Sequence, residues 1–177
     1  MEITICEINK GNQLDFGRCD SSLAVNSKLV LNAEDGRIRY TVVDVSPYIK
    51  EYRRYRTDFA EYENDPTKII FLAYLNDEIA GQVKIMEHWN RYALIDDFAV
   101  DIKYRRQGVG RALIQHCIEW AKKRKFPGIS LETQNINVPA CQLYASCGFE
   151  LRGFDTHLYK AIDPSTDEIA LYWYLMF

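Results

Sequence analysis

Short runs that alternate apolar and polar residues, or that are rich in β-branched ones, open the chain and are typical of half-buried β-strands. They occupy residues 1–8, 29–31 and 38–45. Between the last two runs, residues 32–36 (NAEDG) carry the Asn, Asp and Gly that favour a turn. The pattern therefore predicts an N-terminal antiparallel unit, made of a strand and a hairpin.

An aromatic repeat follows over residues 46–62. Ser46 can cap a helix, and Pro47 suits the first helical turn. Aromatic side chains then recur at steps of four and three, at Tyr48, Tyr52, Tyr55, Phe59 and Tyr62. This spacing predicts a helix with five rings on one face. That face either packs against the core or contributes some rings to the wall of an acceptor pocket.

The rest of the chain alternates strand-like and helix-like segments. The helix-like segments begin at Val109, behind a glycine-bearing turn, and at Asn137, a cap residue whose short helix ends before Gly148. The predicted strands are residues 68–75, 78–86, 93–100, 128–133, 149–153 and 168–177. This order predicts a mixed sheet with helices packed against it, in a single α/β or α+β domain.

Composition and charge narrow the class of protein. The 177 residues, 47% hydrophobic and 27% charged, suit one globular domain whose core needs neither disulfides nor metals. A net charge of -3 argues against a nucleic-acid-binding surface and is compatible with a mildly acidic pocket for a cationic substrate. The chain shows no signal-peptide pattern and no apolar run of transmembrane length, so we expect a cytoplasmic protein without a membrane partner.

Cysteine and histidine offer no metal site in this sequence. The five cysteines are an odd count without a Cys-x-x-Cys pair, which favours reduced, mostly buried thiols. His88, His116 and His157 are dispersed singly, so we expect no metal.

The strand at residues 93–100 leads through a turn with Gly108 and Gly110 into an amphipathic helix. A helix start leaves backbone N–H groups unpaired and carries a partial positive charge, so this turn predicts a pyrophosphate site. It is neither a P-loop nor a dinucleotide fingerprint, because Arg111 follows Gly110 and Leu113 stands where a third glycine is needed.

Two motifs in this half of the chain carry a family resemblance. Phe98-Ala99-Val100 followed by residues 105–110 (RRQGVG) resembles the acetyl-CoA signature of the GNAT family of N-acetyltransferases, and residues 140–149 resemble its second motif. The resemblance implies a mixed, mostly antiparallel twisted sheet flanked by helices, with acetyl-CoA as the donor. It implies one acetyltransferase domain over 1–177, with N-terminal strands and an acceptor-side helix in 1–66 and the acetyl-CoA-binding core in 67–177. A homodimer is common in the family.

A narrower resemblance lies in residues 131–135, 153–155 and 167–175, which are similar to those of the streptothricin acetyltransferases. It implies direct acetyl transfer, in a ternary complex, to the β-lysine amine of streptothricin, a small cationic antibiotic, and hence resistance. Two alternatives stay open. One is an acetyltransferase for a protein N-terminus, a lysine or another small amine, and the other is a non-catalytic acyl-CoA-binding regulator.

The family signature assigns the acetyl-CoA contacts by position. It implies that backbone N–H groups at Gln107 to Arg111 bind the pyrophosphate, and that the Val100 N–H points at the thioester carbonyl. The implied contacts are Phe98, Ala99, Val100, Arg105, Arg106, Gln107, Gly108, Val109, Gly110, Arg111, Asn137 and Tyr144. Tyr144 matches the general acid for the CoA thiolate, but a buried helix tyrosine with a satisfied hydroxyl is the structural alternative. Capping alone would explain Asn137.

Asp96 and Asp97 lie inside an otherwise apolar strand, where unpaired carboxylates are costly. Either could bind the substrate ammonium or accept its proton through water, and the resemblance favours Asp96, with Asp97 second. Because neighbouring strand residues face opposite sides, only one should face the acceptor unless a bulge intervenes. The structural alternative is a salt bridge to Arg91 or Arg105. Four loop acids either line a cationic acceptor site or are solvated: Glu63, Asp65, Glu87 and Asp155.

Overall fold

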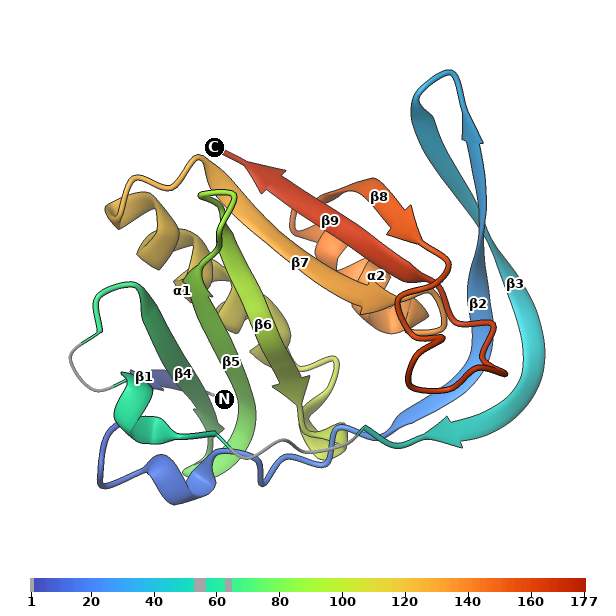
Figure 1. The fold of residues 1–177 in the computed structure, drawn as a ribbon. Helices are drawn as coiled ribbons and strands as arrows, with labels where there is room; N and C mark the ends of the chain where they lie inside the picture. Colours follow the sequence, from blue (N-terminus) through green and yellow to red (C-terminus); the bar gives the residue numbers. More distant parts are fainter. Residues whose placement is uncertain (1, 53–56, 63–64) are drawn as a thin grey trace. The chain divides into compact units, whose positions relative to one another are not determined.

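The computed structural model describes residues 2–52, 57–62 and 65–177, so Tyr55 and Glu63 lie outside the described residues. The chain groups into two compact units. The first is built from residues 1–22, 51–129 and 177, and the second from residues 23–50 and 130–176 (Figure 1).

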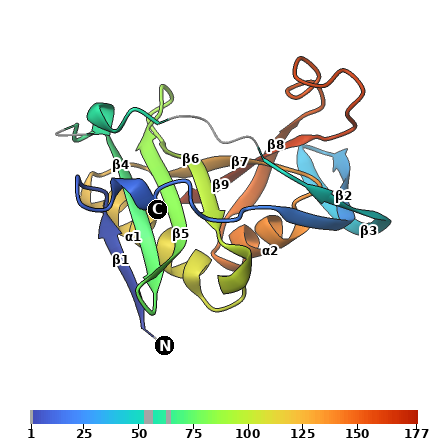
Figure 2. The ribbon, with the colours of Figure 1, turned by 90° about the horizontal axis from the view of Figure 1, so that it is seen from below.

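The first unit is an antiparallel sheet covered by a helix. Its strands lie in the order β1-β4-β5-β6 (Figure 2). Their bounds are β1 Ile3–Glu7, β4 Lys68–Leu75, β5 Glu78–Glu87 and β6 Ala93–Val100, and helix α1 spans Val109–Lys123. Helix α1 buries Leu113, Cys117 and Ala121 on its sheet-facing side. Among its described residues, three 3-10 turns complete the unit: η1 Gln13–Asp15, η2 Phe59–Tyr62 and η3 Ile102–Tyr104.

The second unit combines a long hairpin with three strands and a short helix. The antiparallel hairpin consists of β2 Leu23–Glu34 and β3 Arg37–Lys50 (Figure 1). The other strands lie in the order β7-β9-β8, with bounds β7 Gly128–Gln134, β9 Ala170–Met176 and β8 Glu150–Asp155, and helix α2 spans Val138–Ser146. Strand β7 belongs to this unit from Ser130 onward. Leu29, Leu171 and Trp173 are almost completely buried and form much of its core.

Most elements predicted from the sequence are confirmed. The strand at 93–100 has the predicted bounds, both hairpins form, and the Asn137 side chain caps α2 by accepting from the Ala140 N–H at 3.3 Å. The mixed α/β class with mostly antiparallel pairing is also confirmed. All five cysteines are free, as expected for reduced thiols. Within the described residues, no helix is both long and apolar enough to span a membrane.

The predicted aromatic helix over residues 46–62 is wrong. Strand β3 continues to Lys50, so Tyr48 is paired with Val25, while Tyr52 lies outside any helix and Phe59–Tyr62 is a short 3-10 turn. The cause is tertiary pairing. Partners on β2 extend the strand through Pro47, which an edge strand tolerates, and cross-strand pairing overrides a helical spacing of rings.

Candidate active site

Both strand aspartates lie on the sheet face opposite α1. A side chain at Gly81 of β5 would meet Val109 and Leu113 of α1 at 3.0 and 2.9 Å, so Gly81 and the alternate positions that follow it, Val83 and Ile85, face the helix. Gln82 and Lys84 therefore face the other way. Asp97 is paired directly with Lys84, and opposed residues share a face.

A β-bulge brings Asp96 to the same side as Asp97. Lys84 is paired with Asp97, but the next residue of β5, Ile85, is paired with Ile95, which leaves Asp96 as the extra residue. Ile95 thereby fills a buried position, and the Asp96 carboxylate reaches Lys84 Nζ at 3.4 Å. Strand β6 therefore contains a bulge, the one exception that the sequence allowed to the alternation of side chains between the two sheet faces.

The two carboxylates differ in partner and burial. Asp97 Oδ2 accepts a hydrogen bond of 2.7 Å from Gln82 Nε2, and burial raises its pKa. Asp96 keeps 43% of its side chain exposed and forms its ion pair with Lys84. The structure pairs Asp96 with Lys84, and not with Arg91 or Arg105 as the structural alternative suggested. Arg105 instead donates from Nε to the Val100 carbonyl at 3.2 Å.

Aromatic rings lie near these acids. Burial, followed by the negative charge of Asp96, raises the pKa of Tyr62 to about 12. Phe59 packs edge-on against Phe16 at 5.8 Å between ring centroids, and Lys84 Nζ lies 5.9 Å from the Phe16 ring. Two rings of the aromatic repeat, Phe59 and Tyr62, therefore belong to the carboxylate side of the first unit.

The glycine-bearing turn leads into an uncapped helix start. Gly108 occupies the N-cap of α1 with φ 89°, a left-handed conformation that favours glycine, and offers no side-chain cap. Asp101 caps η3 by accepting from the Lys103 N–H, and Gln107 donates to the Lys103 carbonyl at 2.9 Å. The first turn of α1 holds no acidic residue. These features fit a bound pyrophosphate, because the first N–H groups of a helix have no acceptor four residues earlier within it and the helix dipole favours an anion at this end.

The backbone of β6 directs the N–H group of Val100 away from β5, although Val100 is paired with Gly81. The Asp101 N–H bonds to the Ala80 carbonyl at 3.0 Å, which makes this a hydrogen-bonded pair of the antiparallel ladder. Such pairs alternate with non-bonded ones, so the N–H groups of Phe98 and Val100 point to the opposite edge of β6. Neither of these two N–H groups is therefore directed at β5.

The second unit holds Tyr144 and Asn137. Tyr144 lies on α2 with 4% exposure, and its ring contacts Phe149 at 5.9 Å and Trp173 at 6.4 Å between centroids. The side chain of Asn137 is engaged in capping. Both the general-acid role of Tyr144 and its structural alternative are compatible with this packing.

The remaining loop acids are surface or turn residues. Asp65 accepts from the Thr67 N–H and hydroxyl at 2.8 and 2.6 Å, and these hydrogen bonds lower its pKa. Asp155 accepts from the N–H groups of His157 and Leu158 at 2.7 and 3.1 Å. Glu87 is exposed at the end of β5. Turn formation therefore accounts for Asp65 and Asp155.

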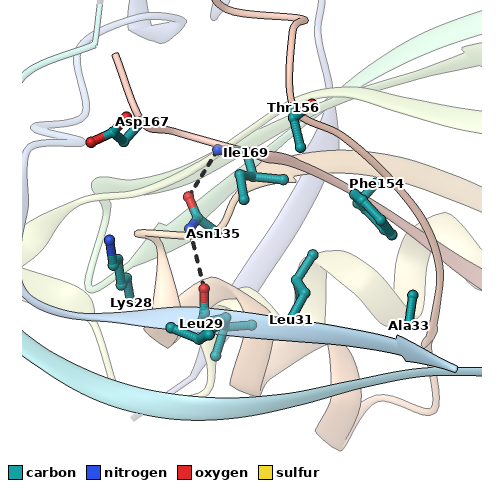
Figure 3. Close-up of a pocket in the computed structure, with 10 residues that line it drawn as sticks. Lys28, Leu29, Leu31, Ala33, Asn135, Phe154, Thr156, Asp167 and Ile169 are labelled. Carbon is teal, nitrogen blue, oxygen red and sulfur yellow. Dashed lines mark hydrogen bonds between the residues drawn. The ribbon is translucent and has the colours of Figure 1, made fainter. Parts of the chain in front are cut away.

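A pocket of about 350 Å³ lies inside the second unit (Figure 3). Buried Asn135 holds it together, because its Nδ2 donates to the Leu29 carbonyl at 3.2 Å and its Oδ1 accepts from the Ile169 N–H at 3.0 Å. The lining is mostly apolar, with Lys28, Thr156 and Asp167 as polar members besides Asn135, and it includes neither Tyr144 nor Asn137. Asn135 thus joins β2 to the residue before β9.

Comparison with known proteins identifies the family. The model of the Acetyltransferase (GNAT) family matches residues 38–149, which contain the bulged strand, the glycine-bearing turn and α2. The chain belongs to the GNAT family. GNAT enzymes are acetyltransferases that use acetyl-CoA as the acetyl donor, so the predicted enzyme class and donor are confirmed.

Several GNAT relatives match over nearly their full length. Streptothricin acetyltransferase A of Bacillus subtilis is 41% identical, with 94% of this chain and 95% of the relative covered. Streptothricin acetyltransferase of Escherichia coli is 32% identical, with 98% and 95% covered. A crystal structure described as a streptothricin acetyltransferase from Bacillus anthracis, in complex with acetyl coenzyme A, is 43% identical, covers 100% of this chain and 98% of that one, and has a TM-score of 0.91.

Sequence reasoning missed the partners of the GNAT strand aspartates. Gln82 and Lys84 are polar residues at alternate positions in the otherwise apolar interior of β5, one strand away from Asp96 and Asp97. Their alternation was a visible signal that one face of this hairpin is polar. The register that sets Lys84 opposite Asp97 depends on the bulge, whose position cannot be predicted from the sequence.

Proposed function

We propose that this GNAT enzyme acetylates an amine of a streptothricin-class antibiotic, in the first place the β-lysine amine, and thereby confers resistance. The observation that carries the proposal is the extent of the match to streptothricin acetyltransferases, which covers 94% and 98% of this chain. By contrast, the match to the [ribosomal protein bS18]-alanine N-acetyltransferase of Escherichia coli, 32% identical, covers 55% of this chain. Full-length similarity supports the antibiotic over a protein N-terminus.

The donor is assigned to the end of β6 and the start of α1. Backbone N–H groups from Gln107 to Arg111 would bind the pyrophosphate of acetyl-CoA, a role supported by the uncapped helix start behind Gly108. Main chain at Phe98, Ala99 and Val100 would pair with the pantetheine arm, assisted by Asn137. The outward direction of the Val100 N–H supports its assignment as donor to the thioester oxygen, which gains negative charge during attack.

The transfer is a direct attack of the amine nitrogen on the thioester carbonyl. The acceptor ammonium must first lose a proton, and we assign this proton to Asp97, directly or through water. A burial-raised pKa supports Asp97, because a stronger carboxylate base is better matched to an amine. The more exposed Asp96 would bind the ammonium electrostatically. As the carbon–sulfur bond breaks, Tyr144 would protonate the leaving CoA thiolate, and the second proton that the attacking nitrogen loses on forming the amide would restore the phenol through solvent.

Acceptor-dependent release of CoA thiol tests this proposal. Purified protein with acetyl-CoA is expected to release thiol rapidly with streptothricin and slowly with aminoglycosides, polyamines or an alanine-initiated peptide. Mass spectrometry of the product should locate one acetyl group on the β-lysine portion. Faster turnover of the peptide than of streptothricin would favour the alternative acetyltransferase, and CoA binding without any turnover would favour a regulator.

We also propose that residues 1–177 act as one acetyltransferase domain in the cytoplasm, where acetyl-CoA is available. A homodimer is our expectation for the assembly. Light scattering coupled to gel filtration measures its mass directly, and a mass of one chain would contradict it.

A further inference from the structure

Gln82 joins one strand aspartate to the N-terminal segment. Its side chain lies on the carboxylate face of β5 and the residue is 6% exposed. Gln82 Oε1 accepts from the Gly17 N–H at 2.7 Å, and Gln82 Nε2 donates to Asp97 Oδ2 at 2.7 Å. Both ends of one buried amide are thus engaged by different parts of the chain.

The Gly17 N–H fixes which way the Gln82 amide points. A backbone N–H can only donate, so the group facing Gly17 must be the amide oxygen, and the NH₂ group must face Asp97. A donor aimed at a carboxylate favours its ionised form. The arrangement therefore presents Asp97 with a fixed donor that cannot itself take up the transferred proton.

We propose that Gln82 is a positioning residue that keeps the Asp97 carboxylate ionised and oriented to accept the proton of the acceptor amine. The inference rests on the proposed function for the identity of the acceptor. It does not follow from the family match, because the geometry that carries it is the Gly17–Gln82–Asp97 chain of hydrogen bonds.

Several groups around Asp97 shift its pKa, and Gln82 opposes the ones that raise it. Burial raises the pKa of Asp97 and the negative charge of Asp96 adds to this, while Gln82 and the Lys84 ammonium lower it. From η2, Tyr62 faces the same acids as a neutral phenol whose pKa is raised. On the N-terminal segment, Asp15 and Arg18 form an ion pair of 2.8 Å with each other. Removing the Gln82 donor leaves burial less opposed.

The test is the pH profile of kcat/KM for streptothricin in Gln82→Met, which keeps the volume and removes the hydrogen bonds. The acid limb should move to higher pH by roughly one unit, since losing a hydrogen bond to the charged form raises a carboxyl pKa. The KM for acetyl-CoA should not change. Gln115→Met is the matched control, because Gln115 donates to Glu119 at 3.1 Å on the exposed side of α1. Its profile should match the wild type.

A second variant guards against a folding defect in Gln82→Met. Gln82→Glu has nearly the same shape and can still accept from Gly17, but it places a second carboxyl beside Asp97 and should move the acid limb further upward. Carbon-13 NMR of the Asp97 carboxyl measures the same midpoint without turnover. The two proposals can therefore fail separately. A wild type that does not turn over streptothricin would refute the proposed function, and the NMR titration would still show whether Gln82 favours the ionised form of Asp97. Folded variants with unchanged acid limb and unchanged carboxyl midpoint would overturn the role of Gln82.

Discussion

Each unit contains a carboxylate inside a strand, and the two are held differently. Asp97 of β6 and Glu132 of β7 both have a pKa raised in the first place by burial. Asp97 accepts a hydrogen bond from the side-chain amide of Gln82. Glu132 accepts one from the phenol of Tyr159, which lies in the segment between β8 and β9. In each case a lysine pairs with a nearby acid, Lys84 with Asp96 and Lys50 with Glu168.

The contrast separates a carboxylate suited to chemistry from one suited to anchoring. Gln82 comes from the neighbouring strand and leaves Asp97 on a face shared with Asp96, beside the aromatic residue Tyr62. Tyr159 comes from a long connection, and its bond to Glu132 anchors that connection to the strand. Burial of a carboxylate therefore does not by itself indicate catalysis, and the origin of its partner is the more informative feature.

The largest expected effect is on Asp97. Asp97→Asn keeps the shape but removes the proton acceptor, so kcat/KM for streptothricin should fall about 100-fold or more, the usual range for a general base. Asp96→Asn should cost about tenfold or less, because an exposed carboxylate contributes less binding energy. Steady-state kinetics on both variants decide the assignment. The reverse order of effects would return the catalytic role to Asp96.

The next effect concerns Tyr144 of the second unit. Tyr144→Phe should lower kcat by about 10- to 100-fold while acetyl-CoA binding is preserved, because only the proton for the departing thiolate is lost. Single-turnover kinetics and calorimetric binding of CoA measure the two quantities. Unchanged turnover with tight CoA binding would leave Tyr144 as a packing residue against Phe149 and Trp173.

Tyr159→Phe should instead affect stability. The Glu132 carboxylate would lose its phenol donor in a partly buried site, which costs about 1–3 kcal/mol of unfolding free energy. Urea denaturation measures this loss. Per folded molecule, kcat should stay near the wild-type value. A large loss of kcat without loss of stability would mean that Tyr159, and not only Tyr144, takes part in the reaction.

The smallest effect is a pH dependence of stability from Glu132. Its raised pKa means that the folded state binds the proton more tightly than the unfolded state. The stability contribution of Glu132 is therefore complete below the ordinary glutamate pKa of about 4.3 and is lost as the pH rises through its folded pKa. As the pH rises across this window, the unfolding free energy of Glu132→Gln should therefore increase relative to that of the wild type. A difference that is constant with pH would contradict the raised pKa.

How much the sequence predicted depended on whether a feature is local. Gly108 and Asn137 were recognised because a left-handed turn and a helix cap each leave a residue signature of a few positions. Tyr48 was misassigned because its strand is decided by pairing with Val25, far away in the sequence. The Gln82 and Lys84 partners, and the bulge at Asp96, likewise depend on cross-strand register. The sequence thus predicted the turn and the helix cap, which depend on neighbouring residues, but not the register between strands.

The most direct test of the central claim is acceptor-dependent thiol release by the wild type beside Asp97→Asn, with acetyl-CoA and streptothricin at saturating concentration. We predict rapid release by the wild type, with one acetyl group on the antibiotic, and a rate lower by about 100-fold in the folded variant. Release at the same rate by both proteins would contradict the assignment of the carboxylate. No release above the acceptor-free rate by the wild type would contradict the proposed activity.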